Sequence, residues 1–227
     1  MDKNDCYGLI KFSGIIICET VFSFVGIPIF GSIMIHSITE VNDVISQKRV
    51  TKLADEINVN IQRIDENSVD KHFLRSEEFH DFFVETLNCT LKERNEDKIK
   101  FFSKLLVDSI VNGEVKYNMD YVKALSELSY EQIVILKEMY NQQKDLPYDE
   151  KDELILLNKH GWQDLSKKMN DKYAIAPEDL TFLLKRVERT GFVYEVNGSY
   201  MSYNGGIYRI TPTFIKLMKK LGSELNE

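Results

Sequence analysis

The side chains best suited to binding chemistry lie near the C-terminal end of the chain. Four of them recur at i, i+3, i+4 and i+7, the spacing that places residues on one face of a helix: Phe182, Lys185, Arg186 and Arg189. Three more follow in an alternating stretch: Tyr200, Tyr203 and Arg209. Lysine and arginine neutralise phosphates, and aromatic rings stack on bases. The pattern therefore predicts a surface that binds a nucleic acid or a nucleotide-like ligand.

The charge of this region leaves a second interpretation open. Residues 128–227 contain 14 Lys or Arg and 15 Asp or Glu, and the whole chain has a formal net charge of −7. Dedicated duplex-binding domains are usually clearly basic. The same cations are also consistent with a solvated helix face or with a contact to another subunit.

The sequence offers little for catalysis. Its four histidines and three cysteines are dispersed, and the motifs GxxxxGK[ST], GxSxG and HExxH are absent. His72 and His80 would share one helix face, but no nearby Cys or His completes a tetrahedral zinc set. We therefore expect no enzyme, no cofactor and no metal site.

The elements that must position the binding residues follow one another from residue 128. Helical periodicity predicts helices over 129–142, 162–173 and 174–193, and Pro177 and Gly191 suit the first turn and the end of the third. We expect Leu180, Leu184 and Val187 to face inward on it. The turns Asn197-Gly198 and Asn204-Gly205-Gly206 then predict a β-hairpin, and residues 211–221 a last helix.

Helices followed by a hairpin are the order of a winged helix-turn-helix. The run LLKRVERTGFVYEV…YRITP resembles the third helix and the wing of that superfamily, in which the third helix often enters the DNA major groove. This resemblance implies the fold of that superfamily.

Residues 38–127 are expected to form a helical middle domain. Apolar residues recur at spacings of three and four from Ile38 to Ile64, and Val44 and Ile45 are among them. Since residues 38–66 contain no Gly or Pro, this pattern predicts one long helix. Ser76 suits the N-cap of a second helix and Gly113 the end of a third. The predicted fold is mainly α: an N-terminal apolar helical hairpin (1–37), this helical domain, and a C-terminal winged helix with a small β-hairpin (128–227).

The N-terminal residues 12–35 read FSGIIICETVFSFVGIPIFGSIMI and contain one charge, Glu19. A spanning helix needs about 20 apolar residues, but Gly26, Pro28 and Gly31 divide this run into two short pieces. Short broken helices are tolerated in a membrane when they pack on protein or line water. We therefore predict a membrane-inserting segment of an oligomer, with these candidate residues: Ile15, Ile16, Glu19, Phe22, Gly26, Pro28 and Phe30. The alternative is a hairpin buried in a soluble oligomer. A cleaved signal peptide fits poorly, because no A-x-A-like site follows the run.

The whole arrangement resembles a loosely defined group of bacterial proteins found with antiphage defence genes. Among them it is most similar to the membrane effector subunits of the Hailong abortive-infection system. This resemblance rests on four features: the apolar segment, the stretches FLRSEEFHDFFVETL and DKIKFFSKLLVDSI, and the winged helix. They are structural patterns and include no catalytic signature.

The resemblance implies an ion-conducting homo-oligomer in the inner membrane with its soluble domains in the cytoplasm. A bound single-stranded nucleic acid or nucleotide signal, made by a partner protein, would hold it silent until infection. Two other functions fit the residues: a winged-helix transcription regulator with an apolar oligomerisation segment, and an adaptor protein.

Overall fold

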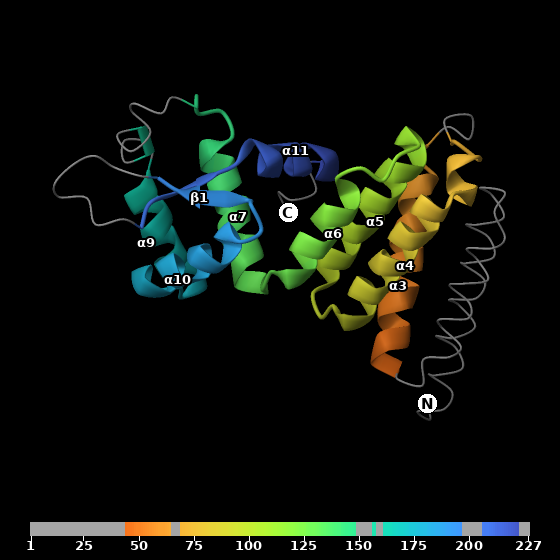
Figure 1. Ribbon diagram of the computed structural model, residues 1–227. Helices are drawn as coiled ribbons and strands as arrows, with labels where there is room; N and C mark the ends of the chain where they lie inside the picture. Colours follow the sequence, from red (N-terminus) through yellow and green to blue (C-terminus); the bar gives the residue numbers. More distant parts are fainter. Residues whose placement is uncertain (1–43, 65–68, 149–155, 158–160, 197–205, 223–227) are drawn as a thin grey trace. The chain divides into compact units, whose positions relative to one another are not determined.

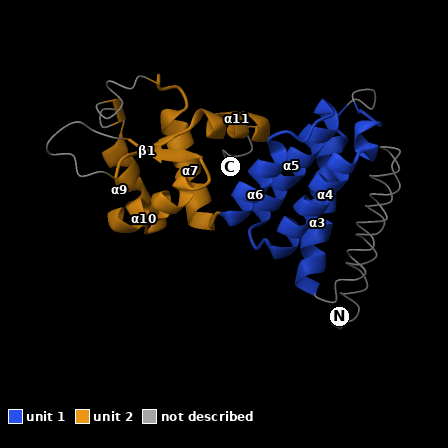
Figure 2. Ribbon diagram, viewed as in Figure 1, with its two compact units in different colours: residues 1–127 blue, residues 128–227 orange. Residues whose placement is uncertain are grey.

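The structure is a computed structural model, and it describes residues 44–64, 69–148, 156–157, 161–196 and 206–222 (Figure 1). These residues are mainly helical and include one two-stranded antiparallel sheet, which confirms this part of the predicted fold class. The chain forms two compact units, residues 1–127 and 128–227 (Figure 2). The expected apolar hairpin and the pore residues assigned to it lie outside the described residues. Within the described ranges, no helix is long and apolar enough to cross a membrane.

The first unit contains α3 (Val44–Ile61), α4 (Glu77–Lys92), α5 (Glu96–Asn112) and α6 (Asn118–Glu127), with a 3-10 turn, η2 (Phe73–Arg75), before α4. Helix α5 packs against α3, α4 and α6, and the four lie side by side in Figure 1. Phenylalanines with almost no exposed surface fill this core: Phe79, Phe82, Phe83 and Phe102. Burying one such side chain contributes about 1.5–3 kcal/mol, so the aromatic residues of this unit stabilise its packing.

The predicted helix ends of this unit are confirmed. The Ser76 hydroxyl accepts a hydrogen bond from the Phe79 N–H at 3.1 Å, which satisfies one of the free N–H groups at the start of α4. Gly113 ends α5 with φ 66°, a left-handed conformation that glycine adopts without strain.

Two features of the first unit differ from the prediction. Helix α3 ends at Ile61 instead of continuing to residue 66, because the next amides form tighter bonds, including Ile64 N–H to the Ile61 carbonyl at 2.9 Å. Val44 and Ile45 are 45% and 60% exposed, so they do not belong to the buried stripe.

Helix α6, for which the sequence predicts no element, begins at Asn118. The Asn118 side-chain amide donates to the Leu105 carbonyl at 3.1 Å and to Asp108 Oδ2 at 2.8 Å, which fixes the start of α6 on α5.

The second unit contains α7 (Tyr130–Gln143), α9 (Trp162–Tyr173), α10 (Pro177–Glu188), β1 (Val193–Glu195), β2 (Tyr208–Ile210) and α11 (Pro212–Leu221). Helix α7 packs against α9, α10 and β2. The Phe214 ring of α11 lies 6.4 Å from Tyr140 and 5.2 Å from Phe192, so α11 joins the same core.

The sheet of the second unit is fixed by its pairing and by α7. Val193 pairs with Ile210 and Glu195 with Tyr208 in the antiparallel register. The Gln143 side chain at the end of α7 donates to the Tyr208 carbonyl at 3.2 Å and accepts from the Ile210 N–H at 3.0 Å. This amide therefore takes the place of a neighbouring strand for β2, and it holds the sheet on α7.

Candidate functional site

Helix α10 presents the predicted binding face, and its core side determines which residues point outward. Leu180, Leu184 and Val187 are at most 2% exposed, as the sequence predicts, and Pro177 occupies the first turn. Gln132 of α7 donates to the Leu183 carbonyl at 3.2 Å, a further tie between α10 and the core. The opposite side of α10 is therefore left for solvent or a ligand.

Three of the four predicted residues of this helix are freely accessible. Phe182 is 61% exposed, so its ring is accessible to a ligand. Arg186 and Arg189 are exposed in the last turn of α10 and just after it. An exposed ring with two cations on the same helix face can stack on a base and pair with phosphates.

Lys185, the fourth residue, is engaged by two carboxylates of its own unit. Its Nζ lies 2.5 Å from Glu195 Oε2 on β1 and 3.3 Å from Glu188 Oε2 on α10. The hydrogen bonds to Glu195 and Glu188 raise the pKa of Lys185 above its usual value, and the bond from Lys185 lowers the pKa of Glu195. The lysine is therefore charged, and its charge is already neutralised.

The hairpin backbone holds these carboxylates in place. Glu195 Oε1 accepts the Gly206 N–H at 2.7 Å, across the sheet from β1. Glu188 Oε1 accepts the Glu195 N–H at 3.2 Å, which links the end of α10 to β1. The prediction recognised the cation. Glu188 is its i+3 neighbour on the same helix, but Glu195 reaches it only because the chain reverses between α10 and β1.

Arg209 does not belong to the binding face, contrary to the prediction. Its residue exposure is 0%, and Nη2 donates to the carbonyls of Leu146 at 3.0 Å and Pro147 at 2.6 Å. Its guanidinium carbon lies 3.8 Å from the centre of the Tyr148 ring. All three residues of β2 are buried, so the expected alternation of inward and outward residues fails in this strand. Tyr200 and Tyr203, the other two hairpin residues, lie outside the described residues.

Two acidic residues at the start of α10 limit what the face can bind. Glu178 and Asp179 are exposed in the first turn. They complement the positive end of the helix dipole, but they would repel the phosphates of a duplex that met this end of α10. A ligand is therefore favoured at the last turn, near Arg186 and Arg189.

The first unit has a pocket of about 470 Å³ beside α3, but its charges compensate one another. Lys52 pairs with Glu56 at 3.0 Å, and Arg49 Nη1 donates to the Leu91 carbonyl at 2.6 Å. Burial raises the pKa of Asp55 in the same lining. The pocket is lined by four cations and three carboxylates, so its charges nearly balance: Lys48, Arg49, Lys52 and Arg94 against Asp55, Glu93 and Glu96.

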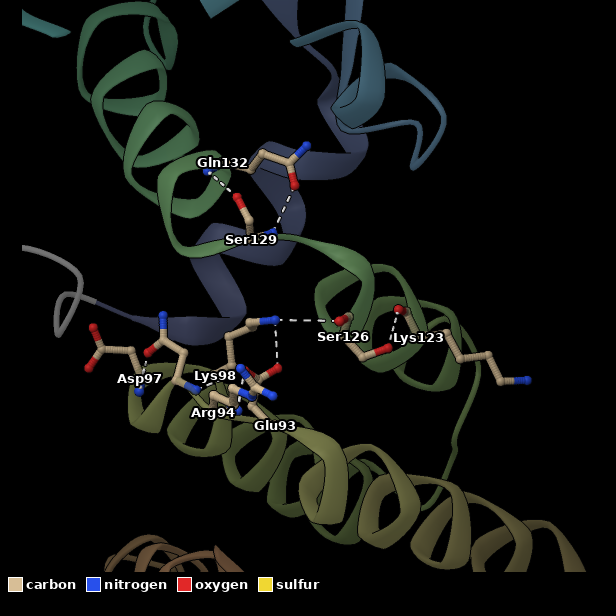
Figure 3. Close-up of polar contacts among 9 residues, drawn as sticks. Glu93, Arg94, Asp97, Lys98, Lys123, Ser126, Ser129 and Gln132 are labelled. Atoms are coloured by element: carbon tan, nitrogen blue, oxygen red, sulfur yellow. Dashed lines mark hydrogen bonds and ion pairs between the residues drawn. The ribbon is translucent and has the colours of Figure 1, made fainter. Parts of the chain in front are cut away.

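A buried ion pair joins Glu93 and Lys98 at the turn between α4 and α5 (Figure 3). Lys98 Nζ lies 2.5 Å from Glu93 Oε2 and 3.4 Å from the Ser126 carbonyl. Glu93 Oε1 accepts the N–H groups of Arg94 and Asn95, each at 2.8 Å. Both charged groups are satisfied by protein atoms, so the pair is a poor candidate for binding or catalysis, and removing either partner would leave the other charge buried without compensation.

The remaining chemistry of the described residues is sparse. No group of His, Cys, Asp and Glu side chains in the described ranges could hold a metal ion. Cys89 is a half-buried free thiol, and burial raises its pKa, so it is mostly protonated at neutral pH. The outer face of α10 is thus the best candidate site in the part of the chain that the structure describes.

Comparison with known protein families, characterised proteins and solved structures finds no match to the chain.

Proposed function

We propose that the chain is a membrane-active effector whose C-terminal unit binds a short single-stranded nucleic acid or a nucleotide signal and thereby controls the N-terminal apolar segment. The observation that carries the ligand part is the outer face of α10, where Phe182, Arg186 and Arg189 are exposed together. The apolar run 12–35 and the resemblance to Hailong effector subunits support the membrane part.

The second unit is best interpreted as a winged helix. Helices α7, α9 and α10 precede the β1–β2 hairpin, α10 packs on α7, α9 and β1, and α11 closes the unit. In this interpretation α10 is the third helix of the superfamily, and β1 and β2 are the strands of its wing. A binding face on the outside of α10 agrees with that arrangement.

A single strand suits this face better than a duplex. Duplex binding is driven by neutralising many phosphates, whereas this face offers two exposed arginines and carries Glu178 and Asp179 at its other end. Single-strand binding instead combines a few cations with base stacking, and the exposed Phe182 ring can supply the stacking.

In the membrane part of the proposal, the subunits of a homo-oligomer insert residues 12–35 together and conduct ions. Each half of this run is too short to span alone, since Gly26 and Pro28 interrupt it. Glu19 then faces the interior of the assembly. The soluble units remain on the cytoplasmic side of the inner membrane, where they meet the signal and the protein that makes it.

Two measurements test the two parts separately. The full-length chain and a chain lacking residues 1–37 are expressed in bacteria while membrane potential is followed, and the cells are then fractionated. We expect only the full-length chain to pellet with membranes and to depolarise the cells.

Binding of a labelled single-stranded hexathymidylate to the detergent-solubilised full chain, measured by fluorescence anisotropy, tests the ligand part. The membrane part fails if both chains stay soluble and the potential holds, and the ligand part fails if no hexathymidylate binds at low salt.

A DNA-binding transcription regulator is the second candidate. It is favoured because α10 follows α9 and packs against it, as the recognition helix does in a helix-turn-helix. It predicts duplex binding that weakens steeply with salt and depends on base sequence. Retention of the chain on a random-sequence duplex at low salt, followed by selection of preferred sites, would support this candidate. No retention of any duplex would exclude it.

A further inference from the structure

We infer that Glu195 is a built-in competitor for the ligand: its carboxylate occupies the position of a phosphate on Lys185, and the ligand must displace it to use this cation. The inference rests on the proposed function, because it concerns the same face of α10. It adds the residue that sets the strength and the selectivity of binding there.

The geometry at Lys185 is that of an occupied anion site. Glu195 Oε2 lies 2.5 Å from Nζ, in the position where a phosphate oxygen would accept a charge-assisted hydrogen bond from the lysine. Glu188 supplies a second carboxylate oxygen at 3.3 Å, and the Tyr208 ring lies 5.7 Å below the same ammonium. The lysine side chain is nevertheless 52% exposed, so a phosphate can reach the ammonium from the solvent side.

Glu195 differs from an ordinary surface carboxylate because the protein holds it in place. Most exposed ion pairs are weak, since two long side chains must be ordered to form them. Here the Gly206 N–H fixes Glu195 Oε1 at 2.7 Å, and the Glu195 backbone is itself bonded to Glu188. The Glu195 side chain is 23% exposed, and its carboxylate is held beside Lys185 before any ligand binds.

This arrangement makes the face selective for ligands that bind at several points. A single phosphate gains little from Lys185, because it only replaces an anion that is already in position. A strand that also contacts Arg186, Arg189 and Phe182 can displace Glu195, since the other contacts keep its phosphate close to the lysine. The wild-type face should therefore bind an oligonucleotide and discriminate strongly against a mononucleotide.

The test compares Glu195→Gln with Glu178→Gln in the full-length detergent-solubilised chain. Both substitutions remove one negative charge near α10, but Glu178 is exposed in the first turn, away from the last-turn contacts of Lys185. The glutamine at 195 keeps an oxygen for the Gly206 N–H. Binding of labelled hexathymidylate is measured by anisotropy between 25 and 200 mM salt, roughly the range over which phosphate contacts weaken most clearly.

We expect Glu195→Gln to tighten hexathymidylate binding about three- to fivefold, the usual size of an exposed charge pair. The dependence of log K on log salt should also steepen by about 0.7, because in the variant a phosphate neutralises Lys185 without releasing a carboxylate that takes up a salt cation. Glu178→Gln should change the affinity less and leave the slope as it is. Lys185→Gln should weaken wild-type binding little, but in the Glu195→Gln background it should cancel the whole gain.

Each result separates the inference from the proposed function. If the wild-type chain binds and the two glutamine variants gain equally, net charge explains the effect and the inference is overturned while the function stands. If Lys185→Gln fails to cancel the gain, Glu195 does not act through the lysine and the inference is again overturned. If Glu195→Gln binds and the wild type does not, the ligand cannot displace Glu195 from Lys185, so the ligand part of the proposed function fails and the inference is overturned with it. If neither the wild type nor Glu195→Gln binds although circular dichroism shows both to be folded, the ligand part of the proposed function fails, and the inference fails with it.

Discussion

The Tyr148 ring lies 3.8 Å from the Arg209 guanidinium carbon, and the Tyr148 hydroxyl donates to the Ile210 carbonyl at 2.8 Å. One side chain after α7 thus contacts two consecutive residues of β2. Together with Gln143, these contacts fix β2, and through the strand pairing they fix Glu195 of β1. The position of the counter-charge on Lys185 therefore depends on contacts made on the far strand of the sheet.

Arg209→Met is expected to destabilise the second unit by about 2–3 kcal/mol. The substitution keeps an apolar stem but leaves the carbonyls of Leu146 and Pro147 without their charged donor. Urea unfolding followed by Trp162 fluorescence reports on this unit, since Trp162 is the only tryptophan and lies 6.3 Å from Tyr208. The matched change Arg189→Met, at an exposed position, should cost less than about 0.5 kcal/mol. Equal losses in the two variants would refute a structural role for Arg209.

The Lys185–Glu195 pair predicts a pH window for the stability of the second unit. The folded pKa of Glu195 lies below its ordinary value of 4.5, so the contribution of this carboxylate is present above about pH 4.5 and is lost as pH falls through the folded pKa. The folded pKa of Lys185 lies above 10.5, so its contribution is complete below about pH 10.5 and is lost at still higher pH.

The measurement for this window compares wild type with Glu195→Gln between about pH 3 and pH 11. We expect the difference in unfolding midpoint to be constant from about pH 5 to pH 10 and to shrink at both ends, because the variant lacks the carboxylate partner. A difference that does not change with pH would show that the pair contributes no charge interaction to stability.

Glu93→Gln is expected to cost about 3 kcal/mol in the first unit. The glutamine can still accept the N–H groups of Arg94 and Asn95, but Lys98, whose side chain is 5% exposed, loses its counter-charge. Thermal unfolding followed by circular dichroism measures the change. The control is Lys100→Met, which removes an exposed pair with Asp97 at 3.9 Å and should cost less than about 1 kcal/mol. A loss for Glu93→Gln no larger than the control would mean that Lys98 finds another partner.

Local signals were sufficient for some helix ends and for the buried side of α10, although α3 and α10 are shorter than the predicted helices over 38–66 and 174–193. Ser76, Gly113 and Pro177 act through their own backbone neighbours, and the spacing of Leu180, Leu184 and Val187 defines the buried side of α10 without further information. Such features depend on contacts within a few residues, which are readable from the chain.

Contacts between segments that are distant in the sequence could not be predicted from the sequence pattern. Arginine is a residue type that often binds phosphates, so the sequence placed Arg209 in the binding site. Its side chain is buried instead, because it donates to the carbonyls of Leu146 and Pro147. Lys185 is a cation in the predicted stripe, but Glu195 reaches it only after the chain reverses at Gly191. Helix α6 likewise depends on Asn118 bonding to α5. Each of these outcomes is decided by partners that periodicity does not reveal.

Cys89 is expected to react slowly with iodoacetamide. Burial raises the pKa of its thiol above the ordinary value, so little of the reactive thiolate is present at pH 7. Mass spectrometry of the peptide that contains Cys89, after timed labelling, should show slower modification than in the urea-unfolded chain. The unfolded chain controls for the intrinsic reactivity of the same peptide. Equal rates in the two states would contradict the burial of this thiol.

Ile16→Arg is expected to abolish membrane pelleting and depolarisation by the full-length chain, if residues 12–35 insert as proposed. An arginine inside an apolar segment costs up to about 3 kcal/mol in insertion, which is up to roughly a hundredfold in the equilibrium. Val59→Arg is the matched control, because Val59 is 44% exposed on α3 and the same change there should leave both readouts intact. Both variants should keep the circular dichroism of the wild type. An Ile16→Arg chain that still pellets with membranes and depolarises cells would show that this segment is not the membrane-active element.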